Sequence, residues 1–206
     1  MSNRYTLFFG FLIAVIIAAV GCGGGKAVKV QTPELPASSE VAMPPGWNDE
    51  DTVAILGKGT ALSSDMQTAI DKADLIAAAD LAAKTERWVT AHGFLRTEDR
   101  DKWSTINQSG NAGDNVEQAY QNEREQVVDQ ILKGTEEVIN KVYREGTQFR
   151  AYIKLKLPVG TANKALRDEI ERRAELMELY KDTEAKKRLD AAVEKYQERR
   201  NTEDNK

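Results

Sequence analysis

The apolar residues of this chain follow three different patterns. Residues 7–20 form an apolar run without a charge, residues 23–46 show little periodicity, and residues 47–200 carry the repeats that are typical of strands and helices. A periodic pattern lets an element bury one face, so the folded part is expected to begin near Trp47.

Three segments alternate apolar and polar residues and are predicted to be strands. Residues 52–62 contain Gly57 and Gly59, and glycines inside a strand indicate a bulge or a close backbone approach. Residues 136–144 and 147–157 flank a Glu-Gly turn and predict a hairpin. In the second hairpin strand every other residue is apolar, so one face is expected to pack and the other to meet water. The apolar set is Phe149, Ala151, Ile153, Leu155 and Leu157.

A long helix is predicted between the first strand and the hairpin. Ser63-Ser64-Asp65 is a helix start signal, and the helical pattern continues to about Ala91. Alanines recur at a spacing of four, and this small-residue face lets the helix axis lie close to a sheet or to another helix. These alanines are Ala69, Ala73 and Ala77.

A second helix is predicted from Asn115 to about Lys133, with an apolar stripe at spacings of four and seven. Residues 93–114, which precede it, are rich in Gly, Asn and Ser, and we expect them to be irregular, with Trp103 holding them in place. An irregular stretch of this length is either functional or mobile.

The C-terminal part, residues 161–200, is predicted to be helical. Its apolar stripe weakens near Asp182 and resumes around Leu189, with charges elsewhere. A helix with so narrow a stripe needs a partner, which is either its own domain or a second copy of the chain.

Together these patterns predict an α+β fold. It consists of a small antiparallel three-stranded sheet in the chain order strand, helix, helix, strand, strand, with helices on one face and a long C-terminal helix. The expected organisation is a signal peptide (1–21), a Gly/Pro-rich tether (22–46), an α+β domain (47–158), a charged helix (159–200) and a disordered tail (201–206).

The N-terminal run has the features of a bacterial lipoprotein signal. Arg4 precedes the run, and Ala19-Val20-Gly21-Cys22 follows with small residues and the only cysteine. A cysteine at this position can receive fatty acyl chains such as palmitate, which anchor a protein to a membrane. A plain cleaved signal with an incidental cysteine is one alternative. A membrane-spanning anchor is another. A spanning helix needs about 20 apolar residues, however, and the run of residues 7–20 has only 14.

Composition narrows the possible functions further. The formal net charge is −4, so nucleic acid is not an expected partner, because nucleic acid binding needs a concentrated basic surface. A lone cysteine excludes an internal disulfide, and a lone histidine, His92, leaves little for His-based catalysis or metal binding. We therefore expect no enzyme activity, no metal site and no cofactor.

Two motifs have plain structural explanations. Gly57-Lys58-Gly59-Thr60 resembles a phosphate loop only superficially, because Thr52 stands where that loop has its first glycine. His92 beside Gly93 is expected at a helix C-terminus, where the helix dipole favours it.

The polar face of the last strand carries a basic row of Arg150, Lys154 and Lys156. We expect either an ordinary solvated face or a docking surface for peptidoglycan or an acidic envelope protein.

Several short motifs resemble those of the Lpp-twenty-like lipoproteins, which include outer-membrane antigens and flagellum-associated lipoproteins of Gram-negative bacteria. The motifs are the signal that ends in Cys22, Pro45-Gly46-Trp47, the strand with Gly57 and Gly59, the alanine-rich helix and the strand at Tyr152-Ile153-Lys154-Leu155. The resemblance spans roughly residues 45–158 and does not include the charged helix after Gly160.

The resemblance implies a non-enzymatic protein with a structural or assembly role in the envelope, with the flagellum as one possible setting. Gly23 stands where Asp would retain a lipoprotein at the inner membrane in enteric-type bacteria. The resemblance to that sorting system therefore implies an outer-membrane anchor. We expect the domain to face the periplasm and to associate with itself through the C-terminal helix or a sheet edge. The alternative is a binding module for peptidoglycan or an envelope protein that uses the basic row.

Overall fold

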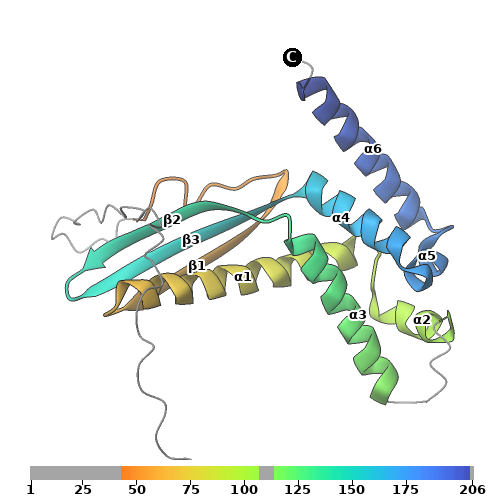
Figure 1. The fold of residues 1–206 in the computed structure, drawn as a ribbon, viewed down its shortest axis with the longest axis horizontal. Coiled ribbons are helices and arrows are strands. Elements are labelled where there is room, and N and C mark those ends of the chain that lie inside the picture. The colour runs from red at the N-terminus through yellow and green to blue at the C-terminus, as the bar shows by residue number, and fades with distance from the viewer. Residues whose placement is uncertain (1–42, 107–113, 205–206) are drawn as a thin grey trace, which may run out of the picture. The chain divides into compact units, whose positions relative to one another are not determined.

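The computed structural model describes residues 43–106 and 114–204. Within them the chain has an α+β fold, as predicted from the sequence, with one three-stranded antiparallel sheet and a long C-terminal helix (Figure 1). The elements are β1 (Ala54–Ser63), α1 (Met66–Ala91), the 3₁₀ helix η1 (Thr97–Asp99), α2 (Arg100–Ile106), α3 (Asp114–Leu132), β2 (Glu136–Glu145), β3 (Gln148–Pro158), α4 (Val159–Arg172), α5 (Ala174–Tyr180) and α6 (Glu184–Asp204).

The sheet has the order β1-β3-β2, so the last strand of the chain is the central one. The predicted hairpin is confirmed: β2 and β3 pair antiparallel around Gly146, whose φ is 62°. A turn residue with positive φ favours glycine, because it has no Cβ to clash. Strand β1 pairs with the other side of β3, with Gly57 opposite Leu155 and Gly59 opposite Ile153.

Helix α1 lies along β1 and β3 at very short range (Figure 1). A Cβ on Gly59 would overlap the backbone oxygen of Ala73, and a Cβ on Gly57 would overlap the backbone oxygen of Ala77. The predicted close approach of a backbone to these strand glycines is therefore confirmed. Asp65 caps the helix, accepting a 2.7 Å hydrogen bond from the Thr68 amide.

The outer edge of β1 is partly covered by side chains of α1. Asp80 accepts a 3.0 Å hydrogen bond from the Lys58 amide, and Lys84 donates a 2.9 Å hydrogen bond to the Leu56 carbonyl. Asp80 and Lys84 also pair with each other at 2.7 Å. Backbone groups of an edge strand that are used in this way cannot pair with another strand.

The opposite sheet face differs from the expectation of an open, wet surface. Tyr152 and Lys154 on β3 are buried there. Residues 43–53, which we call the lead-in segment, supply the cover: Trp47 packs edge-on against Tyr152, with ring centroids 5.1 Å apart. The alternating pattern of β3 alone did not reveal this cover, because it comes from residues about 100 positions earlier.

The helical part is more divided than the sequence suggested. Residues 97–106, predicted to be irregular, form η1 and α2, and Trp103 is buried as expected. The predicted single C-terminal helix is three helices, and α6 continues through Asp204 into the predicted tail. The first break falls at Arg173, which has extended backbone angles.

The C-terminal helices find their partner within the same chain. Helix α4 packs against α3, α5 and α6, and α5 packs against α2. Leu189 and Val193 of α6 are buried in this way. All of these elements belong to one compact unit with the sheet. Of the two alternatives for the C-terminal stripe, folding back onto its own domain is the one observed.

Candidate functional site

Lys154, the central residue of the predicted basic row, is 4% exposed and points into the lead-in segment. Its ammonium donates 2.7 Å hydrogen bonds to the carbonyls of Gly46 and Asp49. Burial lowers its pKa, and the neighbouring charge of Lys58 lowers it further. Lys154 therefore fastens the lead-in segment to the central strand and is not part of an open surface.

The other two members of the row are paired within the chain. Arg150 donates a 2.7 Å hydrogen bond to Glu145, and Lys156 lies 2.7 Å from Asp51. These carboxylates raise the pKa of both cations. The structure brings Lys154 and Lys156 together with the lead-in segment and leaves Arg150 near the hairpin turn. A docking role for the row stays a prediction, and Cys22 lies outside the described residues.

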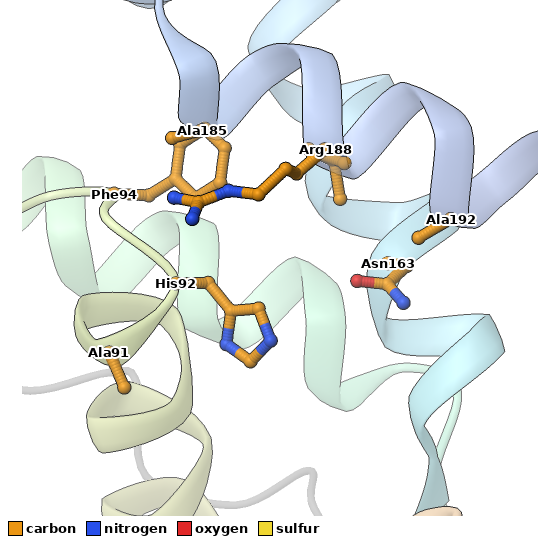
Figure 2. Close-up of a pocket in the computed structure, with 8 residues that line it drawn as sticks. Ala91, His92, Phe94, Asn163, Ala185, Arg188 and Ala192 are labelled. Atoms are coloured by element: carbon orange, nitrogen blue, oxygen red, sulfur yellow. The ribbon is translucent and has the colours of Figure 1, made fainter.

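A cavity of about 370 Å³ lies between the C-terminal end of α1, helix α4 and helix α6 (Figure 2). Volumes of about 300–1,000 Å³ are typical of small-molecule sites. Its walls are mostly small or apolar, with three polar side chains among them. The lining residues are Ala91, His92, Phe94, Asn163, Ala185, Arg188, Leu189 and Ala192.

His92 is the C-terminal cap residue of α1, as the sequence predicted. Its Nδ1 lies 2.8 Å from the carbonyl oxygen of Trp88. A carbonyl only accepts hydrogen bonds, so Nδ1 carries the hydrogen, and in the neutral ring Nε2 is left as an acceptor. The imidazole extends into the space between the helices (Figure 2).

Asn163 of α4 is 9% exposed, and its carboxamide is directed into the same space (Figure 2). No other described residue forms a hydrogen bond with this side chain. Its amide oxygen and nitrogen are both in contact with solvent in the cavity, so they differ from the fully buried, unpaired atoms at Thr85 and Trp103. An unpartnered amide of this kind is typical of a position that a ligand or water satisfies.

The side chain of Arg188 extends from α6 toward Phe94, on the α6 side of His92 (Figure 2). Within the described ranges no carboxylate lies within ion-pair distance of its guanidinium. Glu184, one turn earlier, interacts with the charge of Arg188, but its ion-pair partner is Lys187 at 2.7 Å. None of the eight lining residues is acidic, so the cavity offers a positive charge and no negative one.

Small residues create the space. Gly93, with φ of 94°, ends α1 and turns the chain, and a Cβ there would lie 3.2 Å from the Cβ of Ala185. Glycine and alanine at this contact let α6 approach the end of α1 closely, while Ala91 and Ala192 leave the interior open.

Sequence reasoning singled out His92 but not Asn163 or Arg188. Asn163 and Arg188 lie 71 and 96 positions after His92, and only the fold brings the three together. An available signal was the pair of alanines flanking Arg188 on one helix, Ala185 and Ala192, but alanines are common in helices and do not indicate a cavity by themselves.

In the described ranges, no group of three His, Cys, Asp or Glu side chains is placed to hold a metal ion. None of the helices in those ranges is long and apolar enough to span a bilayer. Comparison with known proteins found no matching family model and no matching curated protein.

Proposed function

We propose that this chain is a lipid-anchored protein of the bacterial outer membrane with a structural or assembly role in the envelope, the flagellar envelope being one candidate setting. The observation that carries the proposal is the apolar run that ends in Ala19-Val20-Gly21-Cys22. Acylation of Cys22 would add two or three chains, and each buried CH₂ contributes about 0.8 kcal/mol of membrane affinity.

The way the tether enters the domain supports an anchoring role. Lys154 bonds the lead-in segment at Gly46 and Asp49, and Trp47 packs on Tyr152. Both contacts are on β3, the strand with a neighbour on each side. A pull on the tether would thus act on the best-supported strand of the sheet.

An assembly role through self-association is best supported at the outer edge of β2. The edge of β1 has backbone groups bonded to Asp80 and Lys84, whereas β2 is largely exposed, with Val138 at a bulge. The stripe of α6 is already used inside the chain. No strand in the described part of the chain pairs with this edge of β2, and such an edge is a template for strand pairing with a second copy.

Replacing Cys22 by Ser tests the anchor. We expect the variant to lose its acyl chains by mass spectrometry and to leave the outer-membrane fraction, whereas the tether control Ser38→Ala should stay there. Unchanged fractionation of the Cys22→Ser protein would refute the proposal.

Light scattering on residues 23–206 tests self-association. Removing residues 1–22 removes none of the described elements. We expect an oligomer whose mass falls when Val138→Lys places a charge at the β2 edge. A strict monomer that is retained by isolated peptidoglycan would instead favour a binding module.

A further inference from the structure

The cavity between α1, α4 and α6 has features that the anchoring role does not use. Among the described residues, it joins an arginine without an acidic partner, a largely buried asparagine whose carboxamide forms no hydrogen bond, and an imidazole whose Nε2 is free as an acceptor (Figure 2). We propose that this cavity binds the C-terminal end of a short peptide, meaning a free carboxylate, one amide and a small apolar side chain.

The charge of the lining points to a carboxylate. Arg188 is the only formally charged residue among the eight, and it is exposed to solvent. A guanidinium presents N–H groups in a fixed fork that matches the two oxygens of a carboxylate. Because Glu184 is already paired with Lys187, Arg188 remains available to a ligand anion.

The polar groups of Asn163 and His92 point to an amide next to that carboxylate. The carboxamide of Asn163 is both a donor and an acceptor, and a peptide group has the complementary pair. The Nε2 of His92 adds one acceptor for an N–H. Water could satisfy these groups singly, but a peptide unit satisfies a donor and an acceptor at once.

The remaining wall sets the size and polarity of the ligand side chains. Phe94 and Leu189 give an apolar surface, and the three alanines keep it shallow. A volume of about 370 Å³ is near the low end for ligand sites. It suits one or two residues with short side chains and excludes a long peptide from the interior.

Calorimetry on the full chain in detergent micelles tests the inference, with N-acetyl-Ala-Ala as the probe and its C-terminal amide as the comparison. We expect the acid to bind about tenfold or more tightly than the amide, because charge-assisted hydrogen bonds to a guanidinium are lost in the amide. Equal binding of acid and amide, or no binding of either, would overturn the inference.

Three variants locate the binding. Arg188→Gln should weaken the acid about tenfold or more, whereas the control Arg200→Gln, on the exposed part of the same helix, should not change it. Asn163→Leu removes the buried amide, and Ala192→Leu fills the cavity; both should weaken binding if their melting temperatures match the parent. Since Arg188 is on the surface, its variant stays informative even if the other two fail to fold, and undiminished binding by it would refute the assignment.

The two possible sources of such a peptide end are distinguished by the D,D form of the same probe. Preference for N-acetyl-D-Ala-D-Ala would indicate a cell-wall stem peptide, and preference for the L,L form would indicate a protein C-terminus. Interpreting a D,D preference as cell-wall binding rests on the proposed envelope location, but the binding of the peptide end does not. Failure of the anchor would appear in the Cys22→Ser fractionation and leave the calorimetry unaffected.

Discussion

The sheet layer, which we define as β1–β3 with α1, and the helical layer, which we define as α2–α6, are held together by different chemistry. In the sheet layer the closest contacts are between backbones: Gly57 and Gly59 of β1 lie against the main chain of Ala73 and Ala77. No charged group takes part in that contact. Van der Waals contact between the two backbones stabilises it, and this contact is possible because glycine has no side-chain atoms in the way.

In the helical layer, the helices are joined by a cluster of charged side chains. Glu169 on α4 is 4% exposed and bonds Arg172 and Arg173, and Arg173 also pairs with Glu123 of α3 at 2.6 Å. Arg173 stands at the break between α4 and α5, so one arginine fixes three helices around a non-helical residue.

The comparison shows that the two layers tolerate different kinds of substitution. A backbone contact tolerates no added atom, because a backbone cannot rotate out of the way. A charge cluster accepts changes of shape but not the loss of one partner, which leaves a buried charge uncompensated. The two layers should therefore fail in different ways, and the following substitutions separate them.

The largest effect is expected from Gly59→Ala. The new methyl would overlap the main chain of Ala73, so α1 must move away from β1, at a cost of about 3 kcal/mol in the free energy of unfolding. Urea unfolding measures this difference.

Gly146→Ala is the matched control, since nothing lies within 4 Å of a Cβ there. It should cost only about 1 kcal/mol, from its positive φ. If both alanines cost the same, backbone contact is not what makes the sheet layer intolerant.

The sheet layer was also the part that the sequence predicted best. Alternation in β3, the helix start at Asp65 and the glycines in β1 are local signals, and each one directly limits the backbone. The alanine spacing of α1 added the correct prediction of a close approach. Glycines in a strand and alanines in a helix specify a close contact between the two elements, because only small residues permit it.

The helical layer was predicted less well because its decisive contacts are between distant charges. Nothing near Arg173 in sequence indicates a break, since the residues that hold it there include Glu123, fifty positions earlier. The apolar pattern continues through the break, so it predicted one helix. The second break, between Tyr180 and Glu184, falls where the apolar stripe weakens near Asp182, and there the Thr183 hydroxyl donates a hydrogen bond to the Tyr180 carbonyl.

The candidate site shows the same limit. The sequence placed Arg150, Lys154 and Lys156 on one strand. It did not predict what surrounds them, because the lead-in segment that covers Lys154 carries no regular pattern. The cavity was missed entirely, since Asn163 and Arg188 belong to different helices and acquire meaning only beside His92.

An intermediate effect is expected from Glu169→Gln in the helical layer. The amide keeps the shape but removes the charge that Arg172 and Arg173 share, and Arg173 retains Glu123. We expect a loss of about 2 kcal/mol in the free energy of unfolding.

Glu178→Gln is the control for Glu169, because Glu178 pairs with Lys181 on the surface. It should leave the unfolding free energy nearly unchanged. A cost for Glu178→Gln as large as for Glu169→Gln would mean that burial of the cluster does not matter.

The smallest effect is expected from Tyr180→Phe, which also lies in the helical layer. The hydroxyl accepts a 2.7 Å hydrogen bond from the Leu95 amide and donates a 2.9 Å hydrogen bond to Asp99. Leu95 is buried with φ of 51°, so its amide would be left unpaired at a strained position. We expect a loss of about 1 kcal/mol at neutral pH, and almost none for Tyr143→Phe on the sheet.

Tyr180 also makes the difference in unfolding free energy between the parent and the Tyr180→Phe variant depend on pH. Burial, and then the charge of Asp99, raises the pKa of Tyr180 well above its ordinary value of 10.0. Above pH 10.0 the unfolded chain releases this proton while the folded chain keeps it, so the free energy of unfolding falls as pH rises, and below that pH the group adds no slope. The Phe variant lacks the group, whereas Lys154 on the sheet is common to both proteins and cancels in the difference. Urea unfolding at about pH 8 and about pH 11 should therefore show that the parent's excess in unfolding free energy over Tyr180→Phe is smaller at the higher pH.

An excess that is constant between the two pH values would mean that the Tyr180 hydroxyl titrates like an exposed phenol. The helical layer would then not exclude water at the contact between α5 and Asp99.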